Sequence, residues 1–131
     1  MQKILNVTFP GNKRVDVESD GVVVKTDQKK IAGGDESAPE PFLLFLSSLA
    51  SCAGIYAVQF CHARDIDTSK MSLTMACDFD PEVKRYTQMT LDLKLPNDFP
   101  ENLKPAIIRA MDLCTVKKHL VNPPEFQIKT S

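Results

Sequence analysis

The sequence lacks an excess of basic residues, a run of lysines and the paired CxxC spacing of a structural zinc site. Its 16 Lys and Arg residues face 17 Asp and Glu residues, for a formal net charge of −1. No positive field is therefore present to attract nucleic acid. The spacing of Cys114 and His119, or of Cys61 and His62, is not that of a metal site. We expect no nucleic-acid partner and no metal.

The start of the chain also lacks the features of a secretory signal. Residues 1–7 alternate between polar and apolar side chains and contain no apolar stretch with a cleavage site. We therefore expect a cytoplasmic protein whose four cysteines are reduced thiols, because disulfides are rare in that compartment.

One internal segment lacks charge altogether. Residues 41–60 contain no Asp, Glu, Lys or Arg, and this length is enough to span a bilayer. Against a membrane span stand Ser47, Ser48, Ser51 and Gln59, and the absence of a basic flank. We interpret the segment as a buried core helix and expect no membrane partner. A helix that is apolar on nearly all sides needs cover, which a small domain has little material to supply, so a homodimer is expected.

The periodicities predict an α+β fold in a single domain over residues 1–131. Alternating patterns predict strands, with an Asp20-Gly21 hairpin turn among the early ones. The Ser37 to Glu40 spacing suits a capping box for a long helix that ends near Ala63. The other elements expected are strands over 4–9, 14–18, 22–26, 71–79, 89–95 and 126–129, and helices over 101–113 and 114–120.

Two cysteines are the strongest candidates for chemistry. Cys52 lies inside the charge-free helix, and Cys114 lies where one helical pattern stops and another starts. Backbone N–H groups at a helix start lower a thiol pKa, so a lowered pKa is expected at Cys114, whereas apolar neighbours raise the pKa of Cys52. Cys52 would then need a cation. Cys61 lies on the opposite side of its helix, where it packs in the core or, if that face is open to solvent, is a surface thiol. Cys77 lies on the apolar face of a strand, so packing is expected for it.

Several motifs, in this order and spacing, resemble one known family. They are Ser19-Asp20-Gly21, Gly33-Gly34, the Ala38 to Pro41 segment that leads into Leu49-Ala50-Ser51-Cys52, and Leu113-Cys114-Thr115-Val116. The chain is similar in them to the OsmC and organic hydroperoxide resistance (Ohr) proteins, which are thiol-dependent peroxidases. The resemblance implies antiparallel sheets packed around a long central helix, an intertwined homodimer, and no metal or organic cofactor.

The resemblance also implies roles for individual residues. Cys52 would be the peroxidatic cysteine and Cys114 the resolving one, with an external dithiol reductant. The family places an arginine near the thiolate, which corresponds here to Arg14 or to the adjacent Lys13. Phe42 occupies the position of the glutamate that orients this arginine, which makes the chain similar to the broader OsmC-like branch.

The role of Glu40 and the function of the protein both stay open at this point. Glu40 lies two residues before the missing carboxylate and either orients the arginine or caps the helix. The expected substrate is an organic hydroperoxide, because apolar side chains would line the approach to Cys52. The rivals are a non-catalytic binder of a small lipophilic or sulfur-containing ligand at the dimer interface, and a structural dimer with inert thiols. The lining residues expected are Phe42, Phe45, Leu49 and Tyr56.

Overall fold

The computed structural model describes all residues from Met1 to Ser131, and the chain forms two compact units, Met1–Ser47 and Ser48–Ser131. Each is described by itself. The elements confirm the α+β class, with two small antiparallel sheets and a long helix. The single domain expected over residues 1–131 stays a prediction.

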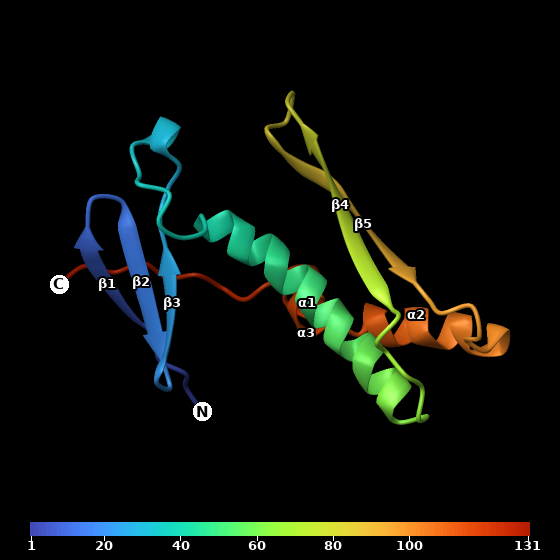
Figure 1. Ribbon diagram of the computed structural model, residues 1–131. Coiled ribbons are helices and arrows are strands. Elements are labelled where there is room, and N and C mark those ends of the chain that lie inside the picture. Colours follow the sequence, from blue (N-terminus) through green and yellow to red (C-terminus); the bar gives the residue numbers. More distant parts are fainter. The chain divides into compact units, whose positions relative to one another are not determined.

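The first unit contains a three-stranded antiparallel sheet in the order β1-β2-β3 (Figure 1). Its strands are β1 (Asn6–Gly11), β2 (Arg14–Ser19) and β3 (Val22–Thr26). Asp20 and Gly21 connect the last two with positive φ angles of 53° and 79°. Such angles match the twist of a two-residue hairpin, which confirms the turn predicted from the sequence.

The segment that follows β3 folds around one carboxylate instead of forming a helix cap. The helix α1 begins at Pro41, so the predicted capping box is wrong. Both the backbone N–H and the hydroxyl of Ser37 donate instead to Asp27, at 3.0 and 2.5 Å. The segment also contains a short 3₁₀ helix, η1 (Lys30–Ala32). Gly34 has no room for a side chain, because an added Cβ would lie 2.1 Å from the carbonyl oxygen of Gln28.

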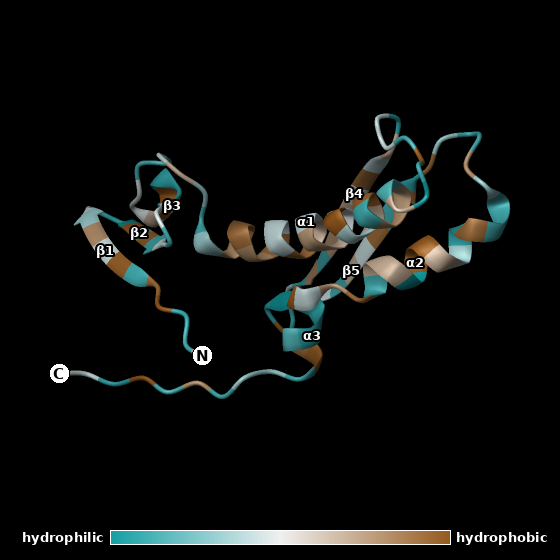
Figure 2. Ribbon diagram, turned by 90° about the horizontal axis from the view of Figure 1, so that it is seen from below, coloured by the Kyte–Doolittle hydropathy of each residue, from teal (hydrophilic) through white to brown (hydrophobic).

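Helix α1 (Pro41–His62) runs for 22 residues and belongs in part to each unit. Its buried residues recur on one face, as expected for a 3.6-residue period. By length and composition alone the helix could cross a membrane, and only 17% of its most apolar window is buried inside the chain. Figure 2 shows apolar residues along most of its length. Much of its apolar surface therefore has no cover within one chain. The buried residues are Leu49, Ala53, Ala57, Phe60 and Cys61.

The second unit combines most of α1, from Ser48 onward, with a β-hairpin and two shorter helices. The hairpin pairs β4 (Ser72–Asp80) with β5 (Arg85–Lys94), as Figure 1 shows. After η2 (Glu101–Leu103) come α2 (Lys104–Asp112) and α3 (Thr115–Val121). These elements enclose an apolar core, which positions the residues at the end of α2 against α1. Its buried members are Ala57, Phe60, Cys61, Phe99 and Ile107.

The strand predicted over residues 126–129 is not formed. Residues 123–131 have no helix or strand, and Phe126 and Ile128 are exposed. The alternation of apolar and polar residues over 126–129 is typical of a strand, but a strand also needs a neighbour to accept and donate its backbone hydrogen bonds. None is available to this segment within the chain.

Candidate functional site

The structure brings Cys52 and Cys114 together. Cys52 is half-buried on α1, and Cys114 is buried at the junction between α2 and α3. The thiol of Cys114 donates a hydrogen bond to the sulfur of Cys52. Both belong to the second unit, and both are free thiols. Cys52 and Cys114 therefore form a reduced dithiol.

The environments of the two sulfurs differ in a way that the sequence did not predict. The backbone N–H of Val116, the thiol of Cys114 and the backbone N–H of Thr115 all contact the Cys52 sulfur and lower its pKa. Burial raises the pKa of Cys114. The expectation of a lowered pKa at Cys114 and a raised one at Cys52 was wrong. The N–H groups at the start of α3 lower the pKa of both thiols, but at Cys114 the effect of burial is larger and raises the pKa.

An apolar cavity of about 520 Å³ adjoins the dithiol. Cys114 forms part of its wall, while Cys52 is not among the lining residues. The ion pair of Asp112 and Lys117 also lies on the wall and supplies its charged groups together with Asp92. The cavity has room for a molecule much larger than hydrogen peroxide. The apolar lining residues are Leu49, Ala53, Met75, Met89, Leu91, Leu93, Ile108, Met111 and Leu120.

The four apolar residues predicted to line the approach have different positions. Leu49 lines the cavity. Tyr56 does not, and its hydroxyl is instead hydrogen-bonded to the hydroxyl of Thr115 at 3.0 Å. This bond ties α1 to the start of α3, beside the N–H groups that contact Cys52. Phe42 and Phe45 belong to the first unit, where their rings contact each other with centroids 5.3 Å apart.

The two remaining cysteines lie outside the dithiol. Cys61 is fully buried in the core, its Sγ is 3.8 Å from the Sδ of Met71, and burial raises its pKa. Cys77 is half-buried on β4, paired with Met89 of β5. The prediction that Cys61 packs in the core is confirmed. Cys77 is a thiol in the same unit that does not belong to the pair, which makes it a useful control.

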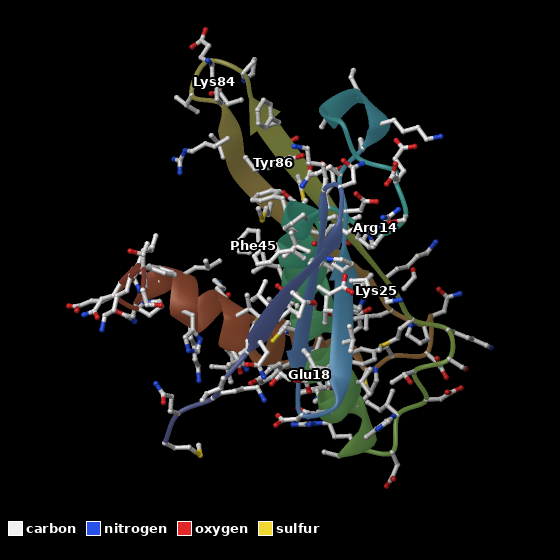
Figure 3. All side chains as sticks on the ribbon, turned by 90° about the vertical axis from the view of Figure 1, so that its left-hand side faces the viewer. Arg14, Glu18, Lys25, Phe45, Lys84 and Tyr86 are labelled. Atoms are coloured by element: carbon white, nitrogen blue, oxygen red, sulfur yellow. The ribbon has the colours of Figure 1, made fainter.

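In the first unit, Arg14 is held by two side chains of the segment after β3. Its Nη2 donates to Asp35 at 2.8 Å, and its Nε donates to the Ser37 hydroxyl at 3.3 Å. Figure 3 shows Arg14 next to this segment. Glu40 instead pairs with Lys29 at 3.9 Å, and Lys13 takes part in no ion pair within the chain. The carboxylate that orients Arg14 is thus Asp35. Glu40 does not contact Arg14 and lies instead at the start of α1, where its backbone carbonyl accepts hydrogen bonds from the N–H groups of Leu43 and Leu44.

Asp27 fixes the position of Ser37, which contacts Arg14. It is fully buried and accepts hydrogen bonds from the side chain and N–H of Ser37 and from the N–H groups of Gln28 and Asp35. These bonds hold the pKa of Asp27 far below its usual value. The Ser37 hydroxyl therefore donates to Asp27 while it accepts from Arg14. Arg14 is thus connected to the buried carboxylate of Asp27 through Ser37.

Sequence reasoning missed the groups that act through the backbone. The N–H groups of Thr115 and Val116 carry no side-chain signature, and their aim at Cys52 depends on the crossing of α1 and the α2–α3 junction. The family spacing, counted back from Cys52, leads to Phe42 and so does not identify Asp35. The polar spacing of the Gly33-Gly34-Asp35 segment was the available signal. No cluster of three or more His, Cys, Asp or Glu residues able to hold a metal is present.

Comparisons with known proteins agree with the fold. The family described as OsmC-like protein matches residues 33–129. A structure from Psychrobacter arcticus, named for osmotic stress induction and a detoxification response, is similar at 18% identity. It has a TM-score of 0.73, with 90% of this chain and 87% of that one covered. No curated protein matches the sequence.

Two further structures are similar over nearly their whole length. An OsmC like protein from Mycoplasma pneumoniae has 16% identity and a TM-score of 0.71, covering 94% of this chain and 89% of that one. An organic hydroperoxide resistance protein from Elizabethkingia anophelis has 18% identity and a TM-score of 0.59, covering 91% and 89%. At such identities these structures bear on the fold, and the family match extends over most of the sequence. The chain belongs to the OsmC-like protein family.

Proposed function

We propose that this protein is a thiol-dependent peroxidase that reduces organic hydroperoxides with Cys52 and Cys114. The observation that carries the proposal is the hydrogen-bonded dithiol beside an apolar cavity. A thiolate, not a thiol, attacks a peroxide, and Cys52 is the member of the pair whose pKa is lowered. The Cys52 sulfur would become a sulfenic acid, and Cys114 would condense with it to a disulfide and water. An external dithiol would then reduce the disulfide.

The cavity supports a bulky organic substrate over hydrogen peroxide. Its wall is mostly hydrocarbon and methionine side chains, which bind apolar groups and adapt to their shape. Similar structures include one named as an organic hydroperoxide resistance protein, as this proposal would lead one to expect.

The test is oxidation of the reduced protein with one equivalent of cumene hydroperoxide, followed by peptide mapping. We expect one disulfide between Cys52 and Cys114, formed equally in Cys77→Ala as the control. A disulfide between Cys61 and Cys77, or no oxidation, would refute the assignment of roles.

We further propose Arg14 as a second activating group, with Asp35 and Ser37 as its positioning residues. The support is the pair of contacts that fix its guanidinium. Alkylation of Cys52 as a function of pH measures the thiolate directly. Arg14→Ala should shift the profile to higher pH, and Asp35→Asn should do so by a smaller amount. Glu40→Gln is the matched control, because it removes a carboxylate that pairs with Lys29 instead.

If Arg14→Ala leaves the alkylation profile unchanged, Arg14 has no part in activation. The N–H groups of Thr115 and Val116 would then account for the Cys52 thiolate by themselves.

A homodimer in the cytoplasm completes the proposal. The support for the dimer is helix α1, because only 17% of its most apolar window is buried within one chain. Sedimentation of detergent-free protein should give a dimer. A monomer, or a protein that dissolves only in detergent, would count against it.

The same cavity also suits a second function, the binding of a small lipophilic or sulfur-containing ligand without turnover. Two results would distinguish it: an apolar probe binds saturably, and Cys52 reacts with hydroperoxide no faster than free cysteine.

A further inference from the structure

We propose that Cys114 is the general acid of the peroxide step, in addition to closing the disulfide. Its thiol would give its proton to the alkoxide that leaves when Cys52 attacks. The inference rests on the peroxidase function proposed above and assigns the source of a proton that the reaction requires.

The positions of the two sulfurs relative to the cavity carry the argument. Cys114 forms part of the cavity wall and Cys52 does not. An apolar group bound in the cavity therefore lies against Cys114, while the hydroperoxide end must reach past it to Cys52. The oxygen attached to the apolar group is the one that leaves, and it lies on the Cys114 side. The Cys114 thiol lies beside the reacting centre, since it interacts with the Cys52 sulfur and lowers its pKa.

The step balances without any further reactant. The Cys52 thiolate attacks the terminal oxygen of R–O–OH, an S–O bond forms, and the O–O bond breaks. Cys52 is oxidised by two electrons to the sulfenic acid, and RO⁻ takes the proton from Cys114 to leave as the alcohol. Cys114 is now a thiolate and attacks the sulfenic sulfur. The S–S bond forms, and hydroxide leaves and takes a proton from solvent.

This sequence explains why the two thiols need unlike environments. Burial raises the pKa of Cys114, so its proton is retained at neutral pH until the alkoxide, a much stronger base, appears. The resolving nucleophile is thereby generated only after Cys52 has been oxidised. A Cys114 that was already ionised would repel the Cys52 thiolate and have no proton to give.

Lys117 is the rival proton donor, because it is the cationic group on the cavity wall. Its ammonium group is paired with Asp112. A proton taken from Lys117 would break this ion pair and generate no nucleophile, whereas loss of the proton from Cys114 produces the thiolate that the next step needs.

The test compares leaving groups in a single turnover at neutral pH. Cumene hydroperoxide releases an alkoxide, which needs a proton, and perbenzoic acid releases benzoate, which does not. Cys114→Ala should slow oxidation of Cys52 by cumene hydroperoxide about 100-fold or more, the usual range for loss of a general acid. The rate with perbenzoic acid should fall far less. Cys114→Ser, with a weaker acid in place, should lie between.

The ratio of the two rates is the decisive readout, because any change in the Cys52 thiolate affects both substrates equally. Cys77→Ala and Lys117→Met should leave the ratio at the wild-type value. Equal slowing with both substrates in Cys114→Ala, no slowing at all, or a change of ratio in Lys117→Met would overturn the proposal. Failure of the peroxidase function itself differs visibly, since wild-type Cys52 would then react with neither oxidant, and the proposal would fall with it.

Discussion

The two units of the chain are held together by different interactions. In residues 48–131 the buried side chains are apolar and most of them form one core, with Ile107 and Cys61 fully inaccessible. In residues 1–47 the buried side chains are Thr26 and Asp27, while valines on β3 and Phe9 on β1 are exposed. The first unit is therefore organised by hydrogen bonds around a carboxylate, and its apolar surface is left uncovered. The second unit therefore has a core of its own that fixes the positions of Cys52 and Cys114. We expect the exposed apolar residues of the first unit to be covered by contacts outside that unit.

The largest expected effect lies in the apolar core of the second unit. Ile107→Ala removes a fully buried side chain and should lower the free energy of unfolding by about 2–5 kcal/mol. Ile108→Ala is the matched control, because Ile108 is the next residue on α2 and is 64% exposed. Its cost should be under about 1 kcal/mol. Denaturant unfolding measures both, and equal costs would contradict the core described for this unit.

A glycine tests the backbone of the first unit. In Gly34→Ala the added methyl group would lie 2.1 Å from the Gln28 carbonyl oxygen, so the segment after β3 has to move. We expect a loss of about 1–3 kcal/mol, as for other overpacked sites. Hydrogen exchange should accelerate in residues 27–40 first. Unchanged protection there would show that this segment is less tightly packed than the structure indicates.

The stability of the first unit should depend on pH through Asp27. The Asp27 carboxylate has a lowered folded pKa, so its contribution is complete above the unfolded value of about 3.9 and is lost as pH falls through the folded value. Asp27→Asn should therefore lower the stability of the first unit at pH 7. The gap between wild type and variant should shrink progressively below pH 4. Proteolysis of residues 1–47 as a function of pH would measure this, and a gap independent of pH would contradict the role given to the charge.

Much of the fold could be predicted because it depends on local patterns. The alternation over β4 and β5, the Asp20-Gly21 turn and the helical spacing of α1 each reflect the sequence within a few residues. What failed depended on distant partners. The 126–129 strand had no neighbour, Ser37 bonded Asp27 instead of capping α1, and the pKa directions at the thiols were reversed by backbone groups and burial.

The candidate site divides in the same way. Both cysteines could be chosen from the sequence, because their helical settings and the family motifs are local. Asp35 could not, since its contact with Arg14 joins residues 21 positions apart through a loop whose path is set by Gly34 and Asp27. Spacing predicts which residues share an element. It does not predict which backbone N–H points at which sulfur.

The smallest expected effect concerns the second glycine, Gly54 on α1. A Cβ there would meet only the Leu73 Cδ2 at 3.7 Å, an ordinary van der Waals contact, and the backbone is helical. Gly54→Ala should therefore stabilise the second unit by up to about 1 kcal/mol through helix propensity, opposite in sign to Gly34→Ala. Thermal unfolding at two protein concentrations checks this. If Gly54→Ala instead destabilises the protein, and does so more at high concentration than at low, a second copy of the chain packs closely on that face of α1 and covers its apolar surface.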